Sequence, residues 1–545
     1  MVVITYLLIL FMADSSHKLF FLLSAIFFSH TCVQSSNASV TNQVDVSFIR
    51  SLCATTPFPD YCLRSLNVSI SIGTSPNPKI NNYLIHSLQT ARSETIKLIN
   101  LFNNVGYPSI IEKQRGAVRD CQELHQSSLA SLEGSISGIR SYNLDITDVA
   151  IYLSAALTNK NTCLEGLDSA TGTMKPVLVK SVINTYKHVS NSLAILYNPE
   201  MGTPENNPLK GDPKWLPSSD QSFFHDSDGL EYDPNEVLVV ASDGTGHFSS
   251  ITEAINFAPN NSMGRTVMYV KEGIYEENVE IPSNKTNIVM LGDGSDVTVI
   301  TGNRSVGDGC TTFGSATLAV SGKGFLARDI GIKNSAGPEK NQAVALRVNA
   351  DLTAFYRCAI HGYQDTLYVH SFKQFYRECD IHGTIDFIFG NAVVVLQECN
   401  IISRKPLHGQ ATVITAQSRN NPLEPTGIVI QRCNIKASFD NSSVKSYLGR
   451  PWKPFSRTVY LESFIDDFID PKGWTEWNNN DKKRLETLYY GEYENYGPGS
   501  STDNRVKWSG YHVMDDDDAN NFTVSKFIDE VHWLQSTLFP FDFQI

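Results

Sequence analysis

The sequence predicts a two-domain protein, with an N-terminal all-α four-helix bundle followed by a C-terminal all-β parallel solenoid. Two observations support this prediction. Apolar residues recur at helical spacing between residues 44 and 200. From residue 235 onward, short Val- and Ile-rich runs alternate with Gly, Asn and Asp at intervals of roughly twenty residues. The chain of 545 residues is also too long for one ordinary core, and its 41% apolar and 19% charged residues are typical of a globular protein.

The helical domain is expected over residues 40–200. Four stretches carry apolar residues three and four positions apart, as on one face of an α-helix: 84–102, 118–136, 149–164 and 178–196. Breaks separate them at Gly106–Pro108, Ser141–Asn143 and Gly172–Pro176. Short connections between long amphipathic helices predict an antiparallel bundle. Residues 201–234, rich in Pro, Asn, Ser, Asp and Gly, predict a linker to the second domain.

Two segments of the second domain, expected over 235–540, nearly repeat each other. Cys358-Ala-Ile-His-Gly-Tyr-Gln-Asp365 is followed 21 residues later by Cys379-Asp-Ile-His-Gly-Thr-Ile-Asp386, and weaker copies surround Cys399 and Cys433. Self-similarity at this period indicates a solenoid in which each repeat forms one coil. No helical pattern separates the runs, so a parallel β-solenoid is favoured over a βαβ fold.

The repeat places two carboxyl groups together. Asp365 and Asp386 each lie seven residues after their cysteine, so they are predicted to be stacked neighbours about 4.8 Å apart. Two carboxylates this close cannot both ionise freely, and the pair therefore supplies an acid and a nucleophile. Gln342 and Gln364, 22 residues apart, are expected to add amide donors for an oxyanion, and Arg450 to hold one carboxylate ionised. This combination indicates acyl transfer.

Each candidate also has a purely structural interpretation. A glutamine in a solenoid turn is usually a ladder residue, and a lone buried aspartate usually caps a turn. An isolated Arg-Pro-Trp usually packs on the surface. His361 and His382 are also repeat-equivalent, and we interpret them as packed turn residues rather than catalysts. The combination of two equivalent aspartates, two glutamines and an arginine favours the catalytic interpretation.

The first 35 residues are expected to be a signal peptide. The apolar run Leu19–Phe28 follows a lysine and is too short to span a bilayer. Translation from either Met1 or Met12 fits this pattern. A membrane anchor made from both N-terminal apolar runs is the alternative, and the polar stretch Asp14–Lys18 argues against it.

Secretion would favour paired cysteines over metal-bound ones, and no Cys-x-x-Cys or His-x-x-x-His cluster suggests a metal. Three disulfides are expected: Cys53–Cys62, Cys121–Cys163 and Cys379–Cys399. Secretion would also expose the Asn-x-Ser/Thr sequons at Asn37, Asn67, Asn260, Asn284, Asn303, Asn441 and Asn521.

Several segments resemble those of plant pectinesterases (pectin methylesterases) that carry an N-terminal pectinesterase-inhibitor-like domain. The matching segments are Gly273–Glu277, Gln342–Leu346, Tyr363–Leu367, Asp386–Gly390 and Leu448–Trp452. The first two cysteine pairs resemble the pattern of the inhibitor domain. The resemblance implies that the solenoid is a right-handed parallel β-helix. It also implies a carboxylic ester hydrolase that demethylesterifies the homogalacturonan of pectin, releasing methanol and pectate without a cofactor.

The resemblance assigns a role to each candidate residue. Asp386 would be the nucleophile and Asp365 the proton donor. The remaining candidates would stabilise the oxyanion or bind the galacturonate chain: Gln364, Gln342, Thr312, Arg450 and Trp452.

The resemblance and the charge of the chain also define its expected surroundings. The protein is expected to be secreted to the extracellular cell wall and to act there as a monomer on pectin. It is expected to bind no nucleic acid, because its net charge is −13. Members of the family often carry a dibasic processing site between the domains, and the stretch Lys214–Phe224 has no paired basic residues. Whether the helical domain is removed is therefore open, and an attached bundle would be able to inhibit the enzyme intramolecularly.

Two other functions compete with esterase activity. Paired carboxylates about 5 Å apart also suit a retaining glycosidase, so a pectin-depolymerising glycosidase or lyase on the same β-helix is the main alternative. It has no evident need for stacked glutamines, and no acidic cluster suggests a catalytic calcium site. A non-catalytic wall-binding or inhibitory protein is the third class, and the intact aspartate pair argues against it.

Overall fold

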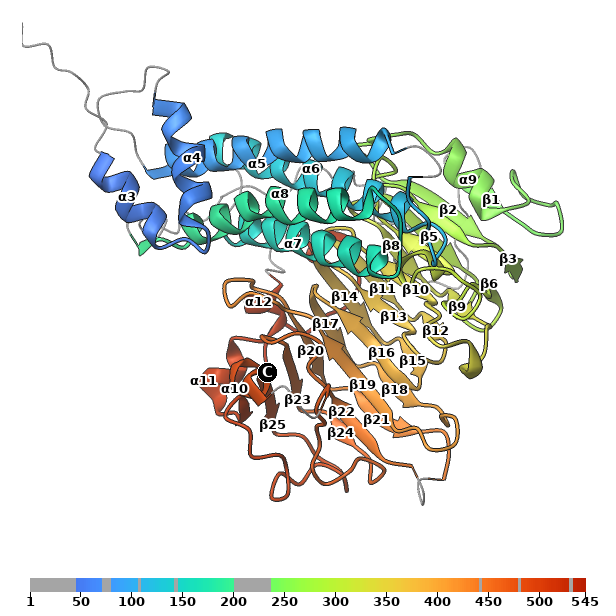
Figure 1. Ribbon diagram of the computed structural model, residues 1–545. Helices are drawn as coiled ribbons and strands as arrows, with labels where there is room; N and C mark the ends of the chain where they lie inside the picture. The colour runs from blue at the N-terminus through green and yellow to red at the C-terminus, as the bar shows by residue number, and fades with distance from the viewer. Residues whose placement is uncertain are drawn as a thin grey trace, which may run out of the picture.

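The computed structural model describes residues 46–70, 80–105, 109–141, 146–199, 237–440, 444–478, 482–528 and 533–545. They form a helical bundle followed by a parallel β-helix, the two-domain architecture that the sequence predicts. Figure 1 shows the long helices packed side by side next to the coils of the β-helix. The expected signal peptide and linker lie outside the described residues. Within the described residues, no helix has the length and apolar character needed to cross a bilayer.

Four long helices form the bundle: α5 (Ile80–Asn103), α6 (Ala117–Ser141), α7 (Ile146–Asp168) and α8 (Lys175–Leu196). Both α5 and α7 pack against α6 and α8, which closes the four-helix arrangement. Two shorter helices, α3 (Val46–Ala54) and α4 (Pro59–Ile70), precede them. The expected pairings Cys53–Cys62 and Cys121–Cys163 are present and join α3 to α4 and α6 to α7.

Three parallel sheets form the walls of the β-helix. The eleven-stranded sheet contains β1 (Leu238–Val240), β2 (Thr266–Val270), β5 (Ile288–Gly292), β8 (Leu326–Arg328), β11 (Thr353–Tyr356), β14 (Lys373–Arg377), β17 (Val393–Gln397), β20 (Gly427–Gln431), β23 (Arg457–Leu461), β25 (Tyr489–Tyr493) and β26 (Tyr511–Val513). The eight-stranded sheet contains β3 (Gly273–Glu276), β6 (Thr298–Gly302), β9 (Gly331–Asn334), β12 (Ala359–His361), β15 (Asp380–Gly383), β18 (Asn400–Ser403), β21 (Asn434–Ala437) and β24 (Phe464–Ile465). The seven-stranded sheet contains β4 (Val279–Ile281), β7 (Leu318–Val320), β10 (Leu346–Val348), β13 (Leu367–Val369), β16 (Ile385–Gly390), β19 (Thr412–Gln417) and β22 (Ser446–Gly449).

Short helices accompany the strands of the β-helical domain. They are α9 (Ile251–Phe257), which packs against β1 and β4, and α10 (Lys482–Thr487), α11 (Asp516–Asn520) and α12 (Val524–Phe527), of which α12 packs against β17. The bundle packs against side chains of the seven-stranded sheet and also pairs with Lys373 on β14 of the eleven-stranded sheet.

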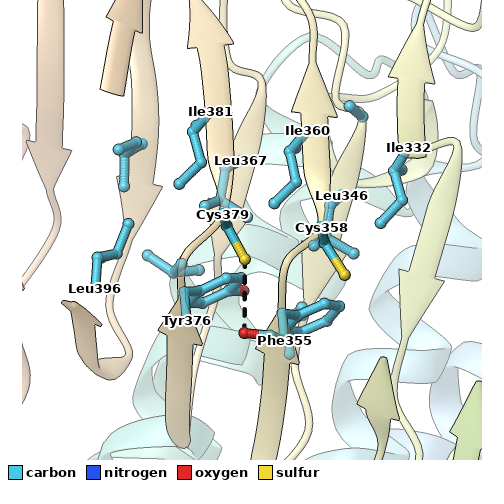
Figure 2. Packing of buried hydrophobic residues seen from close by; sticks show 14 of the residues in the cluster. Ile332, Leu346, Phe355, Cys358, Ile360, Leu367, Tyr376, Cys379, Ile381 and Leu396 are labelled. Carbon is cyan, nitrogen blue, oxygen red and sulfur yellow. Dashed lines mark hydrogen bonds between the residues drawn. The ribbon is translucent and has the colours of Figure 1, made fainter. Parts of the chain in front are cut away.

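The core of the β-helix consists of columns of equivalent side chains. Ile360 and Ile381 pair in register on β12 and β15 and are fully buried. The rings of Phe355 and Tyr376 stack with centroids 4.9 Å apart and an interplanar angle of 5°. Figure 2 shows these columns side by side inside the coils. Because each coil repeats the conformation of the one before it, one sequence repeat specifies a whole column.

A backbone feature that the sequence analysis did not predict marks each repeated cysteine. The residue before Cys358, Cys379, Cys399 and Cys433 has a left-handed backbone with φ between 51° and 53°. A positive φ is uncommon outside glycine. Its recurrence at equivalent positions shows that the corner between the eleven- and eight-stranded sheets is built the same way in each of these coils.

The expected disulfide between Cys379 and Cys399 is not formed, and both residues are buried free thiols. In-register stacking directs the side chains of one column in parallel, and the sulfur atoms of Cys379 and Cys399 each donate to a carbonyl of the preceding coil. Cys379 Sγ donates to the carbonyl of Phe355 at 3.5 Å, as drawn in Figure 2, and Cys399 Sγ donates to that of Tyr376 at 3.6 Å. Coil spacing alone was therefore insufficient to predict a disulfide.

This arrangement predicts a specific pattern of thiol labelling. When the non-reduced protein is denatured and alkylated, the five free thiols of the described residues should be modified: Cys310, Cys358, Cys379, Cys399 and Cys433. Cys53, Cys62, Cys121 and Cys163 should remain unmodified until a reductant is added. Peptide mass spectrometry measures both sets. Recovery of a peptide linking Cys379 to Cys399 would contradict the structure.

Candidate active site

Asp365 and Asp386 lie side by side on adjacent coils, as the repeat predicts. The backbone N–H of Asp365 donates to the carbonyl of Ile385 at 3.0 Å, and Leu367 pairs with Ile388 two residues beyond each aspartate. Both aspartates have left-handed backbones, with φ of 62° and 52°. Such conformations in non-glycine residues concentrate at functional sites.

Two glycines allow these turns to pack closely. A Cβ atom on Gly383 would lie 2.1 Å from the Cβ of Phe387, and one on Gly362 would lie 2.6 Å from Oγ1 of Thr366. The Thr366 hydroxyl donates to the carbonyl of His382 at 3.0 Å. The glycine after each repeated histidine therefore leaves room for the side chains that fix the two aspartates in place.

Arg450 holds the Asp386 carboxylate with two hydrogen bonds. Its Nε lies 2.7 Å from Oδ1 and its NH2 lies 2.5 Å from Oδ2 of Asp386. Paired bonds between a guanidinium and a carboxylate are among the strongest in proteins and fix orientation as well as charge. The guanidinium also lies over the ring of Trp477, 4.5 Å from its centroid. Sequence analysis missed Trp477, because it belongs to no repeat and meets the site only in the folded chain, through Arg450 and Trp452.

The two aspartates differ in their charge environment. Burial raises the pKa of Asp365 well above its usual range, and the neighbouring charge of Asp386 raises it further. Burial also raises the pKa of Asp386, but the hydrogen bonds and charge of Arg450 oppose this effect. One proton shared by such a pair is most stable on Asp365. The geometry therefore places a carboxyl group that favours its protonated form next to one whose charge Arg450 stabilises.

The two glutamines lie near this pair on adjacent coils, offset by one residue. The N–H of Ala343, and not that of Gln342, donates to the carbonyl of Gln364, at 3.1 Å. Both glutamines are half-buried, and neither side-chain amide donates to an acceptor in the described part of the chain. Their amides are therefore available to a ligand.

The remaining predicted residues lie where the two domains meet. The ring of Trp452 lies 6.1 Å from that of Phe389 and 6.2 Å from that of Trp477. Thr312 is half-buried and follows Thr311, whose hydroxyl donates to the carboxylate of Asp120 on α6. Thus the structure places Trp452 close to the Asp386–Arg450 pair and Thr312 at the edge of the bundle.

The bundle covers the aromatic surface beside the two aspartates. Tyr368 and Phe389, each three residues after an aspartate, stack at 4.2 Å and share one buried apolar cluster with bundle residues. Three ion pairs cross the interface: Glu123–Arg347 (3.2 Å), Asp148–Lys373 (2.7 Å) and Glu165–Lys453 (2.6 Å). Thr158 and Thr162 of α7 also bond Asn391 (2.8 Å) and His370 (3.0 Å). The helices α6 and α7 therefore supply the contacts that hold the bundle over this surface.

One group among the described residues has the composition of a three-ligand metal site: Cys121, His125 and Cys163. The two sulfur atoms are joined in a disulfide and offer no thiolate. His125 instead shares a hydrogen bond with the hydroxyl of Tyr186 at 2.9 Å. These residues form a structural cluster in the bundle core.

Comparisons with known proteins match both domains. The Pectinesterase family matches residues 237–531, and the family described as Plant invertase/pectin methylesterase inhibitor matches residues 47–195. A probable pectinesterase/pectinesterase inhibitor 12 of Arabidopsis thaliana is 57% identical over 97% of this chain and 100% of its own length. Pectinesterase 2 of Citrus sinensis is 44% identical over 90% of this chain and 94% of its own length.

The solved structure of a pectin methylesterase from carrot superposes with a TM-score of 0.56 and 50% sequence identity, covering 58% of this chain and all of the carrot chain. The chain therefore belongs to the pectinesterase family, among the members that carry an inhibitor-like helical domain before the β-helix. It is accordingly a carboxylic ester hydrolase.

The buried acid predicts an unusual stability effect. The raised pKa of Asp365 means that the folded protein holds this proton more tightly than the unfolded chain. The stability due to this group is complete at low pH and is lost as the pH rises through the raised pKa. Asp365→Asn cannot ionise, so it should raise the melting temperature at neutral pH by a few degrees, with the gain disappearing on acidification.

Thermal melts across pH measure this difference, and the exposed Asp296→Asn variant serves as a control. A melting temperature for Asp365→Asn that follows the wild type at every pH would show that Asp365 titrates normally.

Proposed function

We propose that this protein hydrolyses the methyl esters of pectin, releasing methanol, with Asp386 as the nucleophile and Asp365 as the acid and base. The observation that supports these roles is the Asp386 carboxylate, held by two hydrogen bonds from Arg450 beside the buried Asp365. The glycosidase or lyase alternative is not supported, because the matching family and the similar structures are pectin methylesterases.

The proposed reaction has two steps. An Asp386 oxygen attacks the C6 carbonyl of a methylated galacturonate, and Asp365 gives its proton to the departing methoxy group, which leaves as methanol. Water then attacks the resulting anhydride while Asp365 takes back a proton. This releases the galacturonate carboxylate and free Asp386.

The other site residues suit the remaining needs of this reaction. The free amides of Gln364 and Gln342 are proposed to donate to the oxyanion that forms at the ester carbonyl. Trp452, Arg450 and Thr312 are proposed to contact the galacturonate chain. Aromatic rings beside a cation suit a sugar chain whose rings are apolar on one face and whose substituents are carboxylates.

Replacing the nucleophile tests this proposal. Asp386→Asn keeps the size of the side chain and removes its nucleophilic charge, so methanol release from methylated pectin should fall to background. The melting transition should remain cooperative. Wild-type protein should release methanol without new reducing ends, which separates ester hydrolysis from chain cleavage. Near-normal methanol release by Asp386→Asn would overturn the assignment of the nucleophile.

We further propose that the attached bundle inhibits the enzyme and that the protein acts in the cell wall. The family match to an inhibitor domain supports inhibition, as do the three carboxylates that the bundle places on cations of the β-helical domain. A bundle tethered by the expected linker would act at high effective concentration. Pectin and the bundle would compete for this surface, because pectin binds there only when the bundle has moved away.

Charge reversal at the interface tests this inhibition in the full chain. The triple variant Glu123→Lys, Asp148→Lys and Glu165→Lys places like charges opposite Arg347, Lys373 and Lys453. Three partly exposed ion pairs are worth roughly 1–3 kcal/mol together, so methanol-releasing activity should rise by about tenfold.

The matched control for charge reversal is Glu133→Lys, which breaks an exposed pair with Arg92 on the same bundle. Unchanged activity of the triple variant, with the bundle shown by mass to be attached, would argue against inhibition.

The interface also contains a pH-sensitive carboxyl group. Asp120 of α6 is buried against the β-helical domain, and this burial raises its pKa to about 6. The hydrogen bond from the Thr311 hydroxyl and the charges of Arg347 and Arg119 oppose the shift. Protonated Asp120 therefore stabilises the state in which the bundle covers the β-helix. This stabilisation is present at low pH and is lost as the pH rises through about 6.

Activity of the full chain, relative to a chain cleaved at an engineered linker site, should consequently increase above this pH. Asp120→Asn should remove much of that increase. If this relative activity had the same pH dependence in the wild type and in Asp120→Asn, Asp120 would be excluded as the responsible group.

A further inference from the structure

The proposed chemistry leaves one pair of side chains without a role. His361 and His382 are partners in the register of β12 and β15 and project from the outer face of the eight-stranded sheet. The residue before each, Ile360 and Ile381, is fully buried in the core. The two imidazole rings stack with centroids 4.4 Å apart and an interplanar angle of 29°.

Both rings are accessible and lack other partners. Each histidine is partly exposed, and in the described part of the chain neither imidazole makes a hydrogen bond or an ion pair. Histidines packed for structural reasons usually place at least one ring nitrogen on a partner. Here both rings have free nitrogen atoms on the same solvent-facing surface.

We propose that His361 and His382 together bind one divalent transition-metal ion of the copper or zinc type. Imidazole nitrogen is a preferred ligand of these metals and binds zinc at about 2.0–2.1 Å. Two nitrogens on one ion therefore lie about 3 Å apart, which rings stacked on adjacent strands reach by small side-chain rotations. Water would complete the coordination, because the described residues offer no third ligand close to both rings.

The charges around the pair permit a cation. Asp380 precedes His382 by two residues and shares its face of the strand, and its carboxylate accepts a hydrogen bond from Asn400 at 2.7 Å. Arg404 is a cation next to the pair, and its guanidinium is engaged on the neighbouring turn, where it donates to the Gly362 carbonyl at 2.8 Å and lies 3.8 Å from the centroid of the Tyr363 ring. Lys333, the partner of His361 on β9, is the other cation next to the pair.

The protonation state of the rings also favours metal binding over competing protons. Burial lowers the pKa of both histidines. The Arg404 charge adds to this effect at His361, and the His361 charge adds to it at His382, whose pKa is about 4. Both shifts favour the neutral imidazole, which is the form that binds a metal.

A bound ion would connect the two turns of the active site. Each histidine lies four residues before a catalytic aspartate, on a turn joined to the other by the Gly362 N–H to His382 carbonyl bond at 3.1 Å. Metal bound to both rings would brace the two coils at this point. The ion would lie outside the ester-binding face, so this inference is independent of the proposed reaction.

Titration of the tag-free, chelator-treated full chain with CuCl2 and, separately, with ZnCl2 tests the site. Isothermal titration calorimetry should show one saturable site, and the melting temperature should rise with added metal. His361→Gln and His382→Gln should each weaken binding by about tenfold or more. His408→Gln, at an exposed histidine elsewhere on the β-helix, is the matched control and should bind as the wild type does.

Electron paramagnetic resonance of the copper complex should show two coordinated nitrogens in the wild type and fewer in His361→Gln. Near-ultraviolet circular dichroism checks that the variants are folded. Absence of saturable binding of both metals would show that the pair is only a packing contact. Equal affinity in the wild type and both histidine variants would place the metal elsewhere, and either result would overturn the proposal.

Discussion

In-register stacking of successive coils is the constraint on which the rest of this structure depends. Each coil repeats the conformation of the last, so one residue type at one repeat position becomes a column. The columns of isoleucine and aromatic side chains form the core. The same geometry brings Asp365 beside Asp386, although they are 21 positions apart and the segment between them includes parts of all three sheets. Stability and catalytic geometry therefore derive from the same repeat.

Stacking also creates an electrostatic difficulty, on which the proposed reactivity of the pair depends. Two buried carboxyl groups one coil apart cannot share a low-dielectric site as two free anions. Arg450 comes from the segment after β22, and its guanidinium donates both hydrogen bonds to Asp386. Asp365, whose pKa the neighbouring Asp386 charge raises further, is left as the protonated partner. The inhibitor-like bundle uses the same face of the β-helix, where its carboxylates meet cations and its apolar residues cover Tyr368 and Phe389.

The sequence was most informative where structure is local or repeated. Helical periodicity located α5 to α8, and the Cys-to-Asp repeat predicted the stacked pair, because both depend on near neighbours or on one constant register. It failed where side-chain direction decides the outcome. Cys379 and Cys399 are one coil apart, yet their sulfurs point to backbone carbonyls. Trp477 and the contact of α7 with the seven-stranded sheet belong to no repeat. They could therefore be identified only from the folded structure.

The central claim is that the stacked pair holds one proton on Asp365 and one charge on Asp386 at neutral pH. The infrared absorption of protonated carboxyl groups tests it most directly, as a difference between the wild type and Asp365→Asn. The account predicts a protonated-carboxyl band in the wild type at neutral pH that is absent from Asp365→Asn. A neutral-pH spectrum without this band, or one in which Asp365→Asn leaves the band unchanged, would contradict it.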